Sequence, residues 1–100
     1  MDPVSRLTID AFRDRVGQSF RDTEAGIAYD LRVVEDLTAL ARNVDPEART
    51  PFSLVFRGPV DPVVAQSIRP LAHDELGELE IFLVPIRQDA EGTEYQAVFT

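Results

Sequence analysis

Residues 77–86 read GELEIFLVPI, and this stretch decides the fold. In an extended strand, successive side chains point to opposite faces of the sheet. Both faces of this strand are apolar: the odd face carries Leu79, Ile81 and Leu83, and the even face carries Phe82, Val84 and Ile86. A strand of this kind must be covered on both sides. One cover is the core of the domain, and the other is either an N-terminal helix or another protein chain.

The residues immediately before this strand, HDELG at 73–77, contain the single histidine of the chain. Four carboxylates lie near it in the sequence, at Asp74, Glu75, Glu78 and Glu80. Histidine with carboxylates can form a metal site or an acid–base pair. A hairpin turn uses the same residue types, with polar residues at its tip and a glycine of positive φ at its end. The pattern favours the turn, and a site around His73 stays open as the alternative.

Period-two patterns predict further strands in the rest of the chain. They cover residues 27–37, 52–57, 66–72 and 93–100, and QSFRD at 18–22 adds a short strand. Within 27–37 the apolar residues at odd positions, Val33 among them, form the predicted buried face. Pro70 suits an edge strand because proline cannot donate a backbone hydrogen bond. Glu91-Gly92 is the predicted centre of the last turn.

A short helix is predicted over residues 9–16. Ile9, Phe12 and Val16 recur at helical spacing, Thr8 can cap the N-terminus, and Gly17 follows the last apolar residue. The polar stretch 39–50 predicts a loop. Five or six antiparallel strands with one N-terminal α-helix indicate a mainly β fold, a small antiparallel β-barrel or curled sheet. The length of 100 residues predicts a single domain over residues 1–100.

The composition argues against several classes of function. The formal net charge is −8, and all ten basic residues are arginine. Phosphate groups repel an acidic chain, so we expect no binding to nucleic acid or to a membrane surface. No apolar run approaches the roughly 20 residues of a membrane span, and the N-terminus shows no signal-peptide pattern. The expected location is the bacterial cytoplasm, or an assembly built there.

Sequence motifs that carry chemistry are missing as well. The chain has no cysteine, which removes disulfides, thiolate zinc sites and cysteine nucleophiles. Its serines lie in no G-x-S-x-G elbow, and its five glycines form no phosphate-binding loop. Glu78 and Glu80 could imitate a glycosidase pair, but such pairs arise by chance among 18 acidic residues. We therefore expect no enzyme activity, no cofactor and no metal ion.

Three arginines lie near predicted strand ends: Arg57, Arg69 and Arg87. Surface arginines that balance the acidic excess are the simplest interpretation. A carboxylate-bearing partner or a buried ion pair is the alternative. We place Arg57, which precedes Gly58-Pro59, beside the candidate interface.

Four segments resemble a family of short bacterial proteins known only as a domain of unknown function. They are Leu7 to Phe20, PFSLVFRGP at Pro51 to Pro59, the segment from Gln66 to Ile86 that ends in LGELEIFLVPI, and YQAVF at Tyr95 to Phe99. Members of that family usually carry tyrosine where this chain has Arg69 or Pro70, which leaves the strand pairing there open. The resemblance implies no catalytic residues. It implies a gene neighbourhood of phage-tail-collar or tail-fibre-like proteins, and hence a structural or accessory role.

The sequence therefore predicts a non-enzymatic interaction module, accessory to a phage-tail-like or fibrous assembly. The partner would be a tail-like or fibre-like protein or a second copy of the chain, which would make a homo-oligomer. Apolar strand surface would be buried, with arginines and acids setting the register. The candidate interface residues are Phe82, Val84 and Ile86 or their odd-face neighbours Leu79, Ile81 and Leu83, together with Arg57. A small-molecule-binding barrel or an enzyme with its site around His73 is the alternative.

Overall fold

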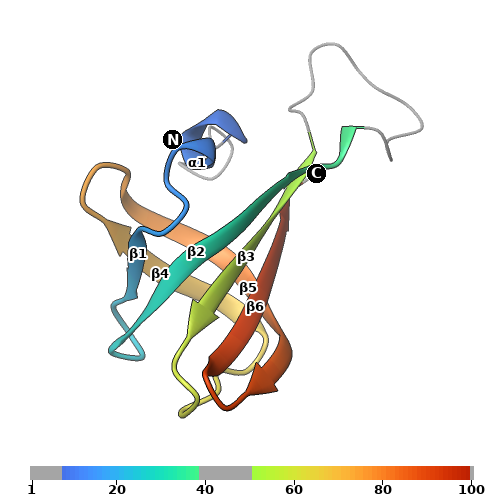
Figure 1. The fold of residues 1–100 in the computed structure, drawn as a ribbon. Helices are drawn as coiled ribbons and strands as arrows, with labels where there is room; N and C mark the ends of the chain where they lie inside the picture. The colour runs from blue at the N-terminus through green and yellow to red at the C-terminus, as the bar shows by residue number, and fades with distance from the viewer. Residues whose placement is uncertain (1–7, 39–50, 100) are drawn as a thin grey trace.

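The computed structural model describes residues 8–38 and 51–99. Six antiparallel strands form a closed barrel in the order β1-β2-β3-β6-β5-β4, and a short helix lies at its upper end (Figure 1). The elements are α1 (Asp10–Arg13), β1 (Ser19–Asp22), β2 (Ile27–Asp36), β3 (Phe52–Gly58), β4 (Ser67–His73), β5 (Gly77–Asp89) and β6 (Gly92–Phe99). The predicted mainly β fold, a small antiparallel barrel or curled sheet with one N-terminal helix, is confirmed, and the sheet closes into a barrel. The predicted loop at 39–50 lies outside the described residues.

Strand β5 joins the two halves of the barrel. Its 13 residues pair with β4 from Gly77 to Leu83, and with β6 from Val84 to Asp89. A bulge between Pro85 and Arg87 interrupts the second ladder. Bulges bend a strand and increase its twist. Because one strand serves two neighbours in succession, the sheet curls far enough to close.

A second bulge lies in β2, between Leu31 and Val33. Tyr29 and Leu31 are fully buried as predicted, but the side chain of Val33 is 47% exposed. The extra residue shifts the alternation by one position, so Val34 packs against the core in place of Val33. The prediction that Val33 faces inward is wrong for this reason.

Aromatic side chains fill the barrel. Those with no exposed surface are Phe12, Phe20, Tyr29, Phe52, Phe56 and Tyr95. The rings of Phe52 and Phe99 stack with centroids 4.6 Å apart, and those of Tyr29 and Tyr95 meet edge to face at 5.1 Å. Each large apolar side chain that is fully buried contributes about 1.5–3 kcal/mol. The interior is therefore a packed core, as in other small barrels.

The helix is shorter than the predicted range 9–16, because α1 spans only Asp10–Arg13. Residues 14–17 after it form turns, and from Gly17 onward the chain is hydrogen-bonded to β2. The Gly17 N–H donates to the Leu31 carbonyl at 2.7 Å, and the Leu31 N–H donates to the Gln18 carbonyl at 3.0 Å. Gly17 has φ 92°, which a helix cannot contain. Val16 consequently stays 52% exposed and does not pack on the domain.

Helix α1 closes the upper end of the barrel. Its Phe12 is fully buried, with its ring centroid within 6.2 Å of those of Phe20, Phe52 and Phe99. This position leaves the outer face of β5 bare, since Phe82 is 49% exposed. The sequence left the helix or another chain as the cover of this face, and the structure rules out the helix.

The last hairpin turns one residue earlier than predicted. Asp89 and Gly92 are cross-strand partners, so Ala90 and Glu91 form the turn. The Asp89 carboxylate accepts hydrogen bonds from the backbone N–H groups of Glu91 and Gly92, at 2.9 and 3.2 Å. A Cβ on Gly92 would lie 2.5 Å from the Gly58 carbonyl oxygen. Gly92 is therefore required by the close approach of β3 and not by the turn.

Candidate interaction surface

The structure decides which face of β5 points outward. Leu79, Ile81 and Leu83 are at most 3% exposed and belong to the core. Phe82 and Ile86 are about half exposed, and Val84 is half-buried on the same outer side. Of the candidate interface residues, the odd-face set is therefore excluded as a docking surface, because a partner cannot reach it.

Neighbouring strands extend the exposed face of β5. Phe82 is the cross-strand partner of Ile68 in β4, which is 63% exposed. A row of paired outward residues crosses four strands, from Val33 through Val55 and Gln96 to Val84. Val98, two residues beyond Gln96 on β6, is 55% exposed. Since β2 lies opposite β5 in the closed ring, we define the outer apolar face as Ile68, Phe82, Val84 and Val98.

Sequence reasoning found only the β5 members of this face. The other members were expected in strands with one buried side, where the outward residue is polar in most proteins. The pairing of these outward residues across strands could have revealed the face, but it depends on the register of the barrel. Isolated surface valines are common, whereas a contiguous apolar group marks an interaction site.

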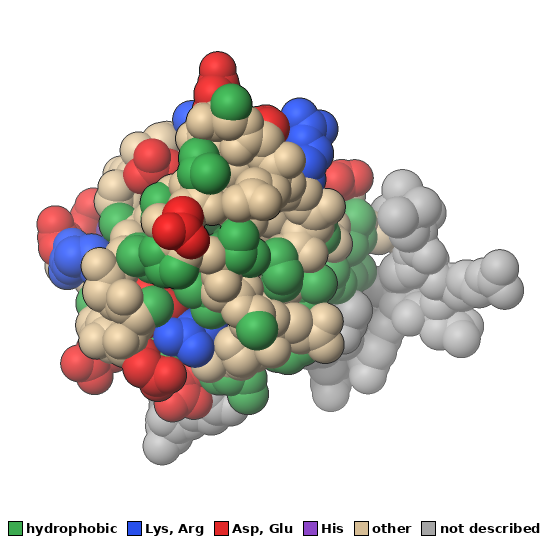
Figure 2. All heavy atoms as spheres, turned by 90° about the horizontal axis from the view of Figure 1, so that it is seen from below, with side chains coloured by type: hydrophobic (Ala, Val, Ile, Leu, Met, Phe, Trp, Pro, Cys, Tyr) green, Lys and Arg blue, Asp and Glu red, His purple; other side chains and the backbone are tan. Residues whose placement is uncertain are grey.

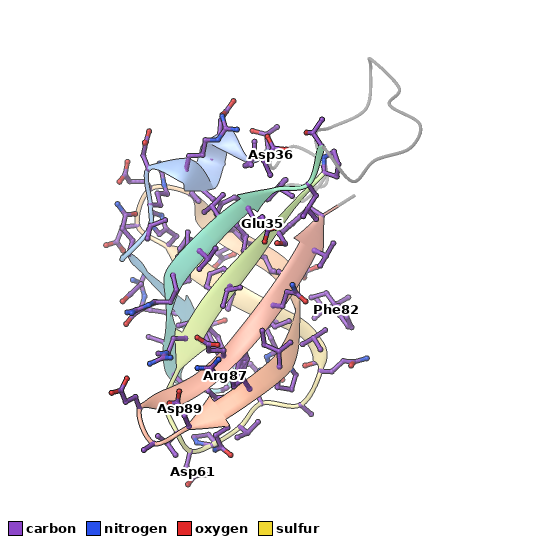
Figure 3. All side chains as sticks on the ribbon, turned by 45° about the vertical axis from the view of Figure 1, so that its right-hand side comes forward. Glu35, Asp36, Asp61, Phe82, Arg87 and Asp89 are labelled. Atoms are coloured by element: carbon purple, nitrogen blue, oxygen red, sulfur yellow. The ribbon has the colours of Figure 1, made fainter. Side chains whose placement is uncertain are left out.

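One end of the outer face of β3, β6 and β5 carries a cluster of charged residues. The Arg57 guanidinium lies 3.2 Å from the carboxylates of Glu91 and Glu94 and 3.6 Å from that of Asp89. The hydrogen bond to Glu94 raises the pKa of Arg57, although desolvation opposes it. Arg87 and Asp89 mark this end in Figure 3, below Phe82. Arg57 is thus neutralised within its own chain and borders the apolar face.

The other end of the β5 outer face is acidic. Glu78 and Glu80 point outward there, and neither forms an ion pair with any residue in the described part of the chain. They border a shallow hollow of about 340 Å³, whose other lining residues are Thr23, Pro70, Leu71 and Leu79. Pro70 pairs with Glu80, one outward step from the Ile68–Phe82 pair. The hollow is therefore continuous with the outer apolar face.

His73 holds the β4–β5 turn. Its Nδ1 accepts hydrogen bonds from the backbone N–H groups of Glu75 and Leu76, both at 3.1 Å, so the ring proton lies on Nε2. Nε2 donates to Gln18 Oε1 at 2.7 Å, and the ring stacks on Phe20. Gly77 ends the turn with φ 77°. The predicted turn is confirmed in its geometry, and both ring nitrogens form hydrogen bonds.

The electrostatics around His73 favour the neutral ring. Burial lowers its pKa below the usual value of 6.5, and the positive charge of Arg15 lowers it further. Asp74 and Glu75 raise it, but less strongly. Their side chains are 84% and 68% exposed, so solvent screens them. A neutral ring suits the turn, because protonating Nδ1 would remove the acceptor for two backbone N–H groups.

The described residues contain a buried polar cluster that sequence reasoning missed. Asp22 at the end of β1 is 2% exposed and accepts hydrogen bonds from Arg69 Nε at 2.8 Å and from the Tyr29 hydroxyl at 2.8 Å. Its other oxygen accepts from Arg69 Nη2 and from the backbone N–H groups of Glu24 and Ala25. Asp22 shares the inward face of β1 with Phe20, which was a signal of its burial. An aspartate before a turn, however, is ordinarily interpreted as a turn residue.

The hydrogen bonds of Asp22 outweigh its burial. Burial alone would raise its pKa, whereas the bonds from Arg69, Ala25 and Tyr29 lower it to about 2. Burial and the bond to Asp22 also raise the pKa of Tyr29. The carboxylate is therefore ionised and the phenol neutral across the physiological range. This arrangement fixes structure, because the Asp22 carboxylate accepts hydrogen bonds from Arg69, Tyr29 and two backbone N–H groups.

The cluster reinforces the seam where the barrel closes. Only two residue pairs, Arg21–Ala72 and Asp22–Leu71, join β1 to β4. Beyond them the Thr23 N–H donates to the Pro70 carbonyl at 3.0 Å. Pro70 therefore turns its backbone toward the end of β1, where its missing N–H costs little. Strand pairing at Arg69 and Pro70 is continuous.

A second group of exposed apolar residues lies at the lower end of the barrel. Figure 2 views this end and shows apolar side chains near its centre with acidic ones around them. Val60 and Val63 in the β3–β4 connection are 40% and 45% exposed. The connection is anchored, since the Val64 N–H donates to the Tyr95 hydroxyl and the Val60 carbonyl accepts from Gln88. It closes the core from below, so its few exposed valines need no partner.

Within residues 8–38 and 51–99, no group of three or more histidine, cysteine or acidic side chains is arranged to hold a metal ion. In the same residues, no helix is long and apolar enough to cross a membrane.

Residues 7–99 match a protein family described as a domain of unknown function, DUF6916. No curated protein and no solved structure matches the chain. The match covers nearly the whole chain, so this protein belongs to that family.

Proposed function

We propose that the protein is a non-enzymatic interaction module that docks another protein on its outer apolar face. The proposed setting is a phage-tail-like or fibrous bacterial assembly built in the cytoplasm. The outer apolar face is the observation that carries this proposal. Contiguous exposed apolar groups on a small domain mark interaction sites more often than they are incidental.

The chemistry of the surface fits a protein partner. Its centre is formed by an aromatic ring and aliphatic side chains, and its ends are charged, the arrangement typical of protein–protein interfaces. Phe82 is the best candidate for an anchor, because large aromatic residues contribute most to binding when a partner desolvates them. Phosphate or lipid head groups are poor candidates for a chain with net charge −8.

The polar residues of the described chain support a role without catalysis. His73, Asp22 and Arg69 are buried titratable side chains, and each is engaged in hydrogen bonds that hold a turn or a seam. A catalytic group needs a free position next to a substrate. The assembly itself is proposed from the resemblance to the family, which implies neighbouring tail-collar or tail-fibre-like genes.

The test is a pull-down from the native host with three immobilised proteins: wild type, Phe82→Glu and Val16→Glu. Val16 is as exposed as Phe82 but lies in the turn after α1, so its variant is a matched control. We expect tail-like or fibre-like proteins to be retained by wild type and Val16→Glu and lost with Phe82→Glu. Equal recovery by all three proteins, or no recovery by any, would overturn the proposal.

A further inference from the structure

We propose that the outer apolar face binds a second copy of this chain, in a two-fold dimer with the β5 strands antiparallel across the interface. This inference rests on the proposed function and specifies its partner. Most closed oligomers have such a symmetry, in which the same surface is used by both subunits. A surface can serve in this way only when it is complementary to itself.

The order of outward residues along β5 has this property. From one end to the other, the outer side carries Glu78, Glu80, Phe82, Val84 and, after the bulge, Arg87 and Asp89. The row thus has two acids at one end, an apolar middle and the cation Arg87 beside Asp89 at the other end. A two-fold axis that crosses β5 between Phe82 and Val84 reverses the second copy. It places Phe82 over the partner's Val84, and Glu80 over the partner's Arg87.

The charged groups that would meet in the dimer are only weakly engaged within their own chain. Arg87 is 66% exposed, and its contacts with Asp89 and Glu94 are long, at 3.8 and 3.9 Å. Glu80 has no ion-pair partner among residues 8–38 and 51–99. Arg57 differs, because two carboxylates hold it at 3.2 Å. Arg87, and not Arg57, is therefore the cation that sets the register of the dimer.

The neighbouring strands fit the same arrangement. An axis across β5 keeps each neighbour on its own side, but β4 pairs only with Gly77–Leu83, so the partner's β4 lies beside the other half of β5. Ile68, which pairs with Phe82, then extends the apolar centre on the β4 side. Two sheets packed face to face lie about 10 Å apart, a distance that the outward side chains of both copies can fill.

The size of the face predicts a weak dimer. A stable interface buries about 800 Å² on each partner, which is about an eighth of the 6219 Å² surface of this chain. The four residues of the outer apolar face cover less than that. We expect a dimer that forms in the range of tens of micromolar and dissociates on dilution.

Sedimentation velocity of the full chain from about 5 to 500 μM tests the inference. Wild type is expected to shift from monomer to dimer with concentration, and Val16→Glu to behave in the same way. Phe82→Glu is expected to weaken the dimer at least tenfold. A wild-type chain that stays monomeric at 500 μM, or forms trimers or larger rings, would overturn the two-fold dimer. The same holds if Phe82→Glu dimerises like wild type.

Charge reversal tests the register. Glu80→Arg and Arg87→Glu each place like charges opposite one another, and we expect each to weaken the dimer about three- to tenfold. The double variant restores the pairs in reversed order and is expected to regain most of the affinity. No recovery in the double variant would overturn the proposed register. Thermal unfolding of each variant confirms that it is folded.

The outcome is separable from that of the proposed function. A monomeric wild type that still retains a tail-like protein through Phe82 rejects the second copy and keeps the docking face. A dimer that depends on Phe82, with no other protein retained, supports the second copy and rejects the accessory role. A wild type that neither dimerises nor retains another protein rejects the outer apolar face as an interaction site.

Discussion

Ile81 and Phe82 are neighbours in β5 and similarly apolar, yet the first is 1% exposed and the second 49%. Ile81 packs in the barrel core, where each buried methylene contributes to the free energy of unfolding. Phe82 lies on the outer wall and makes few such contacts. Strand parity, and not residue type, therefore separates residues that stabilise the barrel from residues that are available to a partner.

The charged residues differ in the same way across the barrel wall. The Asp22–Arg69 pair at the seam is almost fully buried and has a complete set of hydrogen bonds. The Arg57 cluster on the outer wall is partly solvated, and Arg57 Nε is buried without a partner. Inside, an ion pair joins two strands. On the outer wall, the charged side chains of the Arg57 cluster can be rearranged at an interface.

The largest effect is expected from Asp22→Asn. The substitution keeps the shape of the side chain and removes the charge that Arg69 and Tyr29 require. Breaking a buried ion pair at one partner costs about 3–5 kcal/mol of unfolding free energy. Urea unfolding measures it. Asp74→Asn is the matched control, because it removes the 3.1 Å but exposed ion pair with Arg21 and is expected to change little.

The Asp22 carboxylate also predicts an acid limit to stability. Its folded pKa is about 2, below the usual value of 3.8. The stabilisation is therefore complete above about pH 4, and it is lost as the pH falls through 2.

Equal destabilisation by Asp22→Asn and Asp74→Asn would contradict the distinction between inner and outer ion pairs.

Replacing the neighbours in β5 separates the two faces directly. Ile81→Ala is expected to lower the unfolding free energy by about 2–4 kcal/mol, since it leaves a cavity in a packed core. Phe82→Ala removes more atoms but from the outer wall, so we expect a loss below about 1 kcal/mol. Denaturant unfolding of dilute protein gives both values. A larger loss for Phe82→Ala would place that ring in the core of the fold.

The His73 turn predicts a smaller, pH-dependent effect. The pKa of folded His73 lies below that of the unfolded chain, near 6.5. Its contribution is therefore present above about pH 6.5 and is lost as the pH falls through the lower, folded value. His73→Asn keeps an acceptor for the two backbone N–H groups but cannot titrate. The difference in unfolding free energy between wild type and this variant should decrease below pH 6.5. A constant difference would exclude His73 as the source of the pH dependence.

The smallest effect is expected from Arg57→Leu. The variant leaves Glu91, Glu94 and Asp89 without their shared cation, but these carboxylates can be solvated. We expect the thermal midpoint to change less than in the Asp22 and Ile81 variants, and the change to shrink in 0.5 M salt. An effect as large as that of Asp22→Asn, or one that is insensitive to salt, would show that the outer cluster also holds the barrel together.

Much of the fold was predictable because its signals are local. The HDELG turn, the glycine at position 77 and the alternation in β3 each depend on a few adjacent residues. The errors came from contacts between distant residues. Val33 faces outward because of a bulge, and α1 stops early because Gly17 and Gln18 pair with Leu31. Neither event leaves a trace in the residues next to it.

The candidate site was predicted only in part for the same reason. The two-faced strand was visible in the sequence, and so was the set of outward residues on β5. Ile68 and Val98 belong to the face only through the register of β4 and β6 against β5. Arg69 was recognised as a possible buried ion-pair partner, but Asp22 could be matched to it only when the barrel closed.

The sequence by itself determined a cysteine-free, acidic, mainly β domain in which one strand is apolar on both faces. Composition and period-two alternation suffice for this, since both are properties of the chain. Only the tertiary structure decided that the barrel closes, that the odd face of β5 is the core, and that α1 caps one end and leaves the even face bare. Closure depends on the stagger between strands and on the Asp22–Arg69 seam. The two residues of this seam are 47 positions apart in the sequence.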